Sequence, residues 1–245
     1  MVFIKQYGAK RSGTNYLKSI VHSNFEDVIV FSNILGWKHG CYYGDSLLVE
    51  DWFEKKGKVS NSERQDAERL FNKLKVDIIN SIREDDIRYL ISVKNPYSWM
   101  SSMIKYLGKD MSILKNKKFV EKHILNWNNV YRSWISLKDS KQYFLVVKNE
   151  DMLEDFDLNM GIIRDQLKLK TIDGNYFMNN TNKMRNLSDG SWNISNSSLK
   201  KENNNRFYIE KSYLKYFDID MLDNINCFLN KDVMKKLGYE MICNL

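Results

Sequence analysis

Short apolar runs alternate with stretches of helical periodicity along this 245-residue chain. Each run has the length of a buried strand and is followed by polar or glycine-containing sequence. These runs predict strands at Val2–Tyr7, Asp27–Phe31, Arg88–Val93 and Tyr143–Val147. Alternation of strands and helices favours an α/β fold, a three-layer sandwich in which a mostly parallel central sheet has helices on both faces.

Apolar residues at helical spacing follow most of the strands. They predict helices over Thr14–Ser23, over Ser60–Glu84, from Pro96 onward, across Val120–Trp134 and over about residues 149–168, with two more helical segments after Tyr208. Residues 171–206 are rich in Asn, Ser and Gly and lack periodicity. A segment of that length predicts a binding loop or lid, and the absence of internal repeats predicts a single domain over residues 1–245.

Composition narrows the class of protein only slightly. Thirty-eight Lys and Arg against 31 Asp and Glu give a formal charge of +7, which suits an anionic ligand, an acidic polymer or a nucleic acid, although codon bias toward Lys, Asn and Ile would produce the same excess. Cys41, Cys227 and Cys243 lack metal-ligand spacing, so no metal site is expected. Neither a signal peptide nor an apolar run of membrane-spanning length is apparent, so we expect a soluble, cytoplasmic protein.

The most informative segment runs from Gly8 to Leu17, between the first strand and the first helix. Gly8 and Gly13 bracket four residues, as in the nucleotide-binding pattern G-x-x-x-x-G-K-[ST]. Thr14 stands where that pattern has lysine, Asn15 stands where it has the Mg²⁺-binding hydroxyl, and the basic side chains lie upstream. The sequence therefore predicts a loop that cradles a phosphate but does not belong to an ordinary Mg·NTP hydrolase.

The run Lys10-Arg11-Ser12-Gly13-Thr14-Asn15-Tyr16-Leu17 resembles the 5′-phosphosulfate loop of sulfotransferases that use 3′-phosphoadenosine 5′-phosphosulfate (PAPS). That family shows a basic residue, then Ser-Gly-Thr, then a helix. The resemblance implies a P-loop-containing, sulfotransferase-like fold of the bacterial or carbohydrate-type branch. It also implies metal-free transfer of a sulfuryl group from PAPS to a hydroxyl or amine acceptor. Donor-binding roles fall on Lys10, Arg11, Ser12, Gly13, Thr14 and Asn15. Arg11 occupies the family's basic position and is the expected catalytic cation, with Lys10 as the alternative or helper, because many members have lysine at that position.

A second match begins where the third strand ends. Lys94-Asn95-Pro96 with Ser102 eight residues after the lysine resembles the 3′-phosphate site of the same family. A cation at a strand end and a hydroxyl two helical turns later can bind one phosphate, which would select PAPS over ATP. The later run from Lys183 to Trp192 resembles the basic loop that covers the donor in that family, with Lys183 and Arg185 as the binding residues.

The loop Gly36-Trp37-Lys38-His39-Gly40 supplies the candidate catalytic base. An imidazole in a glycine-flanked loop after a strand, with an ordinary pKa of about 6.5, can accept a proton from a hydroxyl near neutral pH. The resemblance places a general base here in some carbohydrate-type members, so His39 is expected to be the base and Lys38 to hold sulfuryl oxygens or an anionic acceptor. A glycan or a small alcohol is the expected acceptor, and a nucleic acid is not an expected partner.

Two further matches and two alternatives complete the reading. Residues 146–153 and 237–240 resemble a strand-end segment and a terminus of the family, with Glu150 and Asp151 expected to be structural anchors. One alternative is a P-loop kinase or NTPase, which Thr14 and Asn15 disfavour. The other is a non-catalytic basic module that binds nucleic acid or acidic polymer, with binding that weakens steeply in salt.

Overall fold

The computed structural model describes residues 2–32, 37–42, 87–172, 174, 176–179, 183–185, 192–194 and 207–243, with backbone alone for 183–185 and 192–194. The helix expected over Ser60–Glu84 lies outside the described residues, as does most of the expected loop or lid at 171–206.

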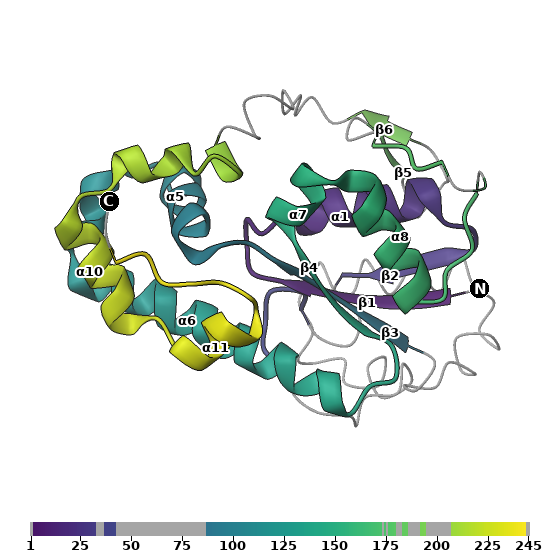
Figure 1. Cartoon of the computed structure of the whole chain (residues 1–245), viewed down its shortest axis with the longest axis horizontal. Coiled ribbons are helices and arrows are strands. Elements are labelled where there is room, and N and C mark those ends of the chain that lie inside the picture. Colours follow the sequence, from purple (N-terminus) through teal and green to yellow (C-terminus); the bar gives the residue numbers. More distant parts are fainter. Residues whose placement is uncertain are drawn as a thin grey trace, which may run out of the picture.

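Four parallel strands form the central sheet, in the order β2-β1-β3-β4 (Figure 1). They are β1 (Val2–Gly8), β2 (Val28–Phe31), β3 (Ile87–Val93) and β4 (Phe144–Lys148). In the register, Gly8 is opposite Ser92, and Val93 is opposite Lys148. The carboxyl ends of β1, β3 and β4 therefore meet at one edge, and the predicted α/β class with a parallel sheet is confirmed.

Helices pack against both faces of this sheet. Successive residues of a strand point to opposite faces, so they belong to two different apolar cores. Phe3, Tyr7 and Ile91 belong to one apolar core, while Ile4 and Leu90 belong to the other. The first core is covered by α5 (Pro96–Tyr106), α6 (Lys117–Ile135), α10 (Ile219–Phe228) and α11 (Lys231–Lys236). The second is covered by α1 (Thr14–Asn24), α7 (Asn149–Glu154) and α8 (Phe156–Gln166) (Figure 1).

Short capped segments interrupt the longer helices that periodicity predicts. The helix expected over residues 149–168 is divided, because the Asp155 carboxylate accepts a hydrogen bond from the Leu158 N–H at 3.0 Å and starts α8. Three 3₁₀ helices, η2 (Met111–Lys115), η3 (Ser136–Asp139) and η4 (Ser212–Tyr216), complete the helical elements that the structure describes. Among the described residues, no helix combines the length and the apolar character needed to span a bilayer.

Part of the expected loop or lid has regular backbone. Phe25, just after α1, forms an isolated antiparallel bridge with Thr171. Farther along, β5 (Lys183–Arg185) pairs antiparallel with β6 (Trp192–Ile194), and β5 lies beside α1. A role of this segment in ligand binding stays a prediction.

The strand order creates a switch point between β1 and β3. The chain leaves β1 toward β2 on one side, and β3 pairs with the other side of β1. Ligands of open parallel sheets bind outside the carboxyl ends of the strands at such a point. The Gly8–Asn15 loop follows β1 and Lys94 follows β3, so two of the predicted motifs flank this position.

Candidate functional site

Both glycines of the first motif are required by the geometry of the loop. A Cβ atom on Gly8 would lie 2.6 Å from the Thr14 methyl group and 2.8 Å from the Ser92 carbonyl oxygen. Gly13 has φ +88°, a left-handed conformation that disfavours other residues, and a Cβ there would lie 2.6 Å from the Asn149 amide oxygen. The turn after β1 is therefore tight, and it packs against the end of β3 and the start of α7.

The start of α1 is open to an anion. Gly13 is its N-cap residue and offers no side-chain cap, and the first turn contains no acidic residue. The N–H groups of a first helical turn lack intrahelical partners, and the helix dipole adds positive potential there. Of the neighbouring side chains, Asn15 is exposed, whereas Ser12 and Thr14 are buried. The exposed start of α1 thus has the features of an anion-binding helix terminus.

Ser12 shapes the loop from inside. Its N–H donates to the Ala9 carbonyl at 3.1 Å, and its own carbonyl accepts a hydrogen bond from the Ser92 hydroxyl at 2.5 Å. The side chain is fully buried. Through these hydrogen bonds, the backbone of Ser12 closes the turn and attaches the loop to β3.

Aromatic side chains from two helices support the loop from behind. The Trp99 indole of α5 donates to the Lys10 carbonyl at 2.7 Å. The Tyr131 hydroxyl of α6 donates to the Ser92 carbonyl at 2.9 Å and accepts from the Ala9 N–H at 3.4 Å. The backbone from residue 9 to residue 12 is thereby fixed before any ligand binds.

The two basic side chains of the loop face different neighbours. Lys10 Nζ lies 5.1 Å from the ring centroid of Trp37, and the Arg11 guanidinium carbon lies 5.4 Å from that of Tyr106. Both basic residues are exposed, and Arg11 has φ +69°. A cation over an exposed aromatic ring gains only about 0.5–1 kcal/mol, so both side chains can move to an anion at low cost.

Residues 37–40 dock directly on the loop. The Gly8 N–H donates to the Lys38 carbonyl at 2.9 Å, and Lys38 Nζ donates to the Asn15 amide oxygen at 2.7 Å. His39 Nδ1 lies 2.5 Å from the Gly8 carbonyl oxygen. The structure therefore brings Lys38 and His39, which the sequence places more than 20 residues away, to the same loop as Lys10 and Asn15.

The surroundings of His39 keep its ring neutral at pH 7. Burial lowers its pKa, the hydrogen bond to Gly8 opposes this, and the charges of Lys38, Lys10 and Lys5 lower it further, to about 4. Because a carbonyl oxygen only accepts, Nδ1 carries the proton of the neutral ring and Nε2 keeps its lone pair. Nε2 is the atom that can accept a proton from a substrate.

Lys94 and Ser102 come together as the second motif predicts. Lys94 Nζ lies 3.5 Å from the Ser102 hydroxyl, and the Lys94 side chain is only 5% exposed. At the start of α5, the Asn95 amide oxygen accepts from the Tyr97 N–H at 3.1 Å, and Glu150 accepts from the Asn95 N–H at 2.9 Å. The Asn95 cap and the Glu150 hydrogen bond together fix the backbone next to Lys94.

Tyr208 joins this pair, and sequence reasoning did not single it out. Lys94 Nζ lies 4.1 Å from the Tyr208 ring centroid, and the Tyr208 hydroxyl lies 3.4 Å from that of Ser102. Burial raises the pKa of Tyr208, but the charges of Lys94 and Arg11 and the hydrogen bonds of its hydroxyl outweigh burial and lower it below the ordinary value. No motif marks this tyrosine, because only the folded chain brings it to α5.

The remaining predicted residues are placed as follows. Arg185 pairs with Trp192 in the β5–β6 hairpin, but the side chains of Lys183, Arg185 and Trp192 lie outside what the structure describes. Glu150 is an anchor as expected, since it also accepts from the Tyr239 hydroxyl at 2.9 Å.

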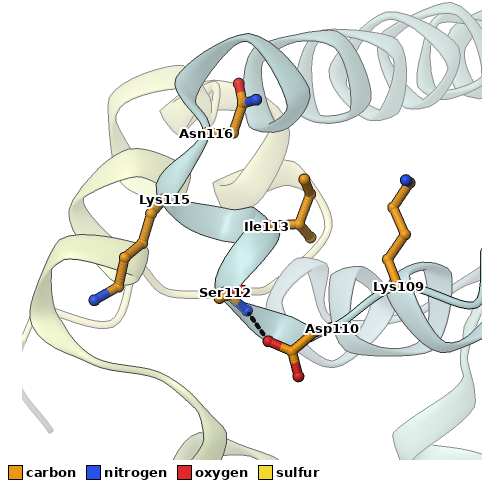
Figure 2. A pocket seen from close by; sticks show the side chains of 6 residues that line it. All are labelled: Lys109, Asp110, Ser112, Ile113, Lys115 and Asn116. Carbon is orange, nitrogen blue, oxygen red and sulfur yellow. Dashed lines mark hydrogen bonds between the residues drawn. The ribbon is translucent and has the colours of Figure 1, made fainter.

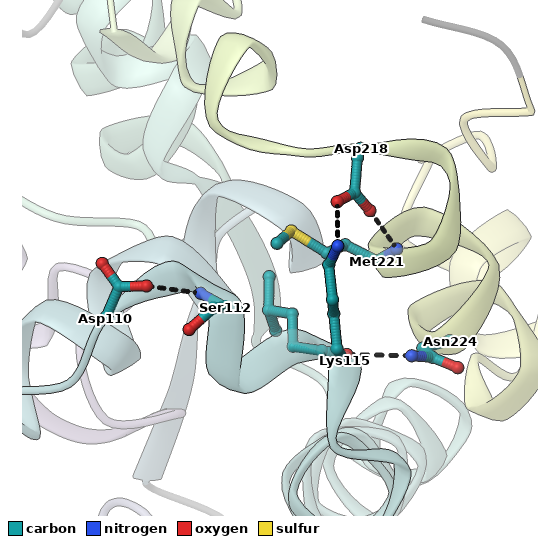
Figure 3. A network of polar contacts seen from close by, with 7 residues as sticks. Asp110, Ser112, Lys115, Asp218, Met221 and Asn224 are labelled. Atoms are coloured by element: carbon teal, nitrogen blue, oxygen red, sulfur yellow. Dashed lines mark hydrogen bonds and ion pairs between the residues drawn. The ribbon is translucent and has the colours of Figure 1, made fainter.

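A separate hollow of about 570 Å³ lies beside η2, lined by Lys109, Asp110, Ser112, Ile113, Lys115 and Asn116 (Figure 2). Its polar groups hold η2 in place: Asp110 accepts from the Ser112 N–H at 2.8 Å, and Lys115 forms an ion pair with Asp218 at 2.9 Å (Figure 3). Asn224 of α10 donates to the Leu114 carbonyl at 3.0 Å. None of the predicted site residues lines this hollow.

In the described part of the chain, no three His, Cys, Asp or Glu side chains gather in an arrangement that could hold a metal ion.

No protein-family model, curated protein or solved structure matches this chain. What the site does must therefore be inferred from its own chemistry: an open helix start, two exposed cations, a neutral histidine and a buried lysine.

Proposed function

We propose that this chain is a PAPS-dependent sulfotransferase that transfers the sulfuryl group to a hydroxyl acceptor. The observation that carries the proposal is a pair of separate cationic sites at the carboxyl ends of the neighbouring strands β1 and β3. One is the Gly8–Asn15 loop and the other is Lys94 with Ser102. PAPS has anionic groups at both ends of its ribose, a 5′-phosphosulfate and a 3′-phosphate, so it requires two such sites.

Lys94 supports the choice of a 3′-phosphorylated ligand. Its ammonium group is buried, and its partners within the described residues are a hydroxyl and an aromatic ring, with no carboxylate among them. Burying a cation is costly unless a charged or hydrogen-bonding partner compensates it. A phosphate bound between Lys94, Ser102 and Tyr208 would offset that cost with charge-assisted hydrogen bonds.

The chemical step assigns a role to each group beside the loop. The acceptor oxygen attacks sulfur as His39 Nε2 takes its proton, and a new S–O bond forms. The bond between sulfur and the bridging oxygen breaks, and that oxygen keeps the electron pair in the leaving adenosine 3′,5′-bisphosphate. The loop N–H groups and a neighbouring cation stabilise the charge that develops on it.

The two basic side chains of the loop have different proposed roles. Lys10 lies on the side of Trp37 and lowers the pKa of His39, so it is close to the base. Arg11 lies on the side of Tyr106 and lowers the pKa of Tyr208, so it is close to the Lys94 site. We assign Lys10 to the sulfuryl transfer and Arg11 to donor binding.

Labelled-sulfate transfer from PAPS to a panel of glycans and small alcohols tests this function. His39→Ala is expected to lower kcat about 10²- to 10⁴-fold, as for loss of a general base, and Lys10→Ala about 10²- to 10³-fold, as for loss of an oxyanion-stabilising group. Arg11→Ala is expected to raise the KM for PAPS more than it lowers kcat. Arg164→Ala is the matched control, because Arg164 is a surface arginine of α8 that pairs with Asp165.

Full turnover in His39→Ala would remove the histidine from the mechanism. Mg·ATP-dependent phosphoryl transfer by the wild-type protein would favour a kinase. Transfer that fails for every acceptor, from a protein that binds nucleic acid with steep salt dependence, would favour the basic binding module.

A further inference from the structure

Trp37 is a large apolar side chain that is 43% exposed beside the candidate base. The backbone that carries it forms a turn, in which the Gly40 N–H donates to the Trp37 carbonyl at 2.8 Å. The turn sets the position of Trp37 beside the loop after β1.

The indole is also in contact with His39. The two ring centroids are 5.2 Å apart, and the rings are nearly perpendicular, at 87°. A hydroxyl that gives its proton to His39 Nε2 must lie within about 3.2 Å of that atom. The carbon skeleton that carries the hydroxyl then reaches the indole, so Trp37 is placed to touch the acceptor.

In the free protein, Lys10 lies over the same indole at 5.1 Å. That contact is weak at an exposed position, whereas a hydrogen bond from a charged donor to an anion is stronger. An anionic donor on the loop would therefore draw Lys10 from the ring. Donor binding would uncover the indole face next to the base.

We propose that the exposed face of Trp37 is the acceptor platform, that it takes a pyranose ring, and that it becomes available once the donor has drawn Lys10 away. The proposal rests on the proposed function, and it adds the residue that binds the acceptor and an order of binding. A pyranose has an apolar face of C–H groups, which the electron-rich face of an indole attracts. Its hydroxyl rim can hydrogen-bond to polar groups such as Lys38 and Asn15, whose side chains are joined by a hydrogen bond of 2.7 Å beside the start of α1.

Tyr106 provides a matched control within the same chain. Its side chain is 58% exposed, and Arg11 lies over its ring as Lys10 lies over the ring of Trp37. Tyr106 belongs to α5, however, and not to the segment that contains His39. Replacing either ring by alanine removes one exposed aromatic side chain next to one loop cation. Only Trp37→Ala should affect the acceptor.

The test is saturation-transfer NMR with lactose and with N,N′-diacetylchitobiose, at saturating adenosine 3′,5′-bisphosphate and without it. We expect wild type to bind at least one saccharide and to bind it about two- to fivefold more weakly without the bisphosphate, because the sugar must then displace Lys10 from the ring. Trp37→Ala should weaken saccharide binding at least tenfold, and Trp37→Phe should retain most of it. Tyr106→Ala should bind like wild type. Titration with the bisphosphate alone should give each alanine variant an affinity equal to that of wild type or up to about fivefold tighter, because only a weak contact that ligand binding breaks is lost.

The proposal is overturned if neither saccharide binds the bisphosphate-loaded wild type, if Trp37→Ala binds as tightly as wild type, or if Tyr106→Ala loses as much. Saccharide binding that is independent of the bisphosphate would overturn the order of binding. Any of these results, if the bisphosphate still binds normally, would reject this inference without rejecting the proposed donor site. Failure of the bisphosphate itself to bind would reject the proposed function, and this inference with it.

Discussion

His39 owes its chemistry to groups from three separate segments. Lys5 lies on β1, Lys10 on the loop after it, and Lys38 on the segment that docks there, and all three lower the pKa of the imidazole. The Gly8 carbonyl fixes the proton on Nδ1. A glycine-flanked histidine could be recognised in the sequence, but neither its pKa nor its tautomer could, because both depend on contacts between distant residues.

The free protein is therefore expected to keep His39 neutral until the pH falls to about 4. An anion on the loop would offset the charges of Lys10 and Lys38, so adenosine 3′,5′-bisphosphate should raise the pKa of His39 toward its ordinary value of about 6.5. NMR titration of the imidazole signals, with and without the bisphosphate, measures both values.

His123 is the internal reference for this titration. Burial and the neighbouring Lys122 lower its pKa, and it lies on α6 away from the loop. Its titration should be the same with and without the ligand. An unchanged pKa of His39 in the loaded protein would contradict the placement of an anion beside it.

Among the elements, the four strands of the central sheet were predicted to within one residue at each end, whereas β5 and β6 were not predicted. The four are mostly apolar, as strands buried on both faces are, and β3 at Ile87–Val93 compares with the expected Arg88–Val93. The helices were predicted less well where a polar side chain caps the backbone. Asp110 caps η2 and Asp155 starts α8, and such local hydrogen bonds override apolar periodicity.

The loop after β1 makes a stability prediction with a control in the same molecule. In Gly8→Ala the new Cβ would overlap the Thr14 methyl group and the Ser92 carbonyl, so we expect a loss of about 1–3 kcal/mol in the free energy of unfolding. In Gly161→Ala nothing lies within 4 Å of the new Cβ, and α8 gains a better helix former, so we expect a gain of about 0.5–1 kcal/mol. Urea denaturation measures both. Equal effects of the two substitutions would mean that the turn is not as tight as described.

At the scale of the whole molecule, the order of the strands assembles the site. Sequence patterns indicated that the motifs follow strands, but they could not show that β1 pairs with β3 across some 80 residues, which sets Gly8 opposite Ser92. That pairing places the loop beside Lys94. The contribution of Tyr208 could not be predicted either, because Tyr208 is more than 100 residues from Lys94 in the sequence and only folding brings its ring to that lysine.

The proposed function requires that two anion sites bind one ligand with phosphates at both ends of its ribose. Calorimetric titration in EDTA with adenosine 3′,5′-bisphosphate and with adenosine 5′-monophosphate compares ligands with and without the 3′-phosphate. Charge-assisted hydrogen bonds of about 1.5–3 kcal/mol at the 3′-phosphate correspond to about 10- to 100-fold tighter binding of the bisphosphate. Lys94→Ala should erase that difference, and Lys109→Ala, an exposed lysine at the hollow beside η2, should keep it. Equal affinity of the wild-type protein for the two nucleotides would mean that Lys94 and Ser102 do not bind a 3′-phosphate.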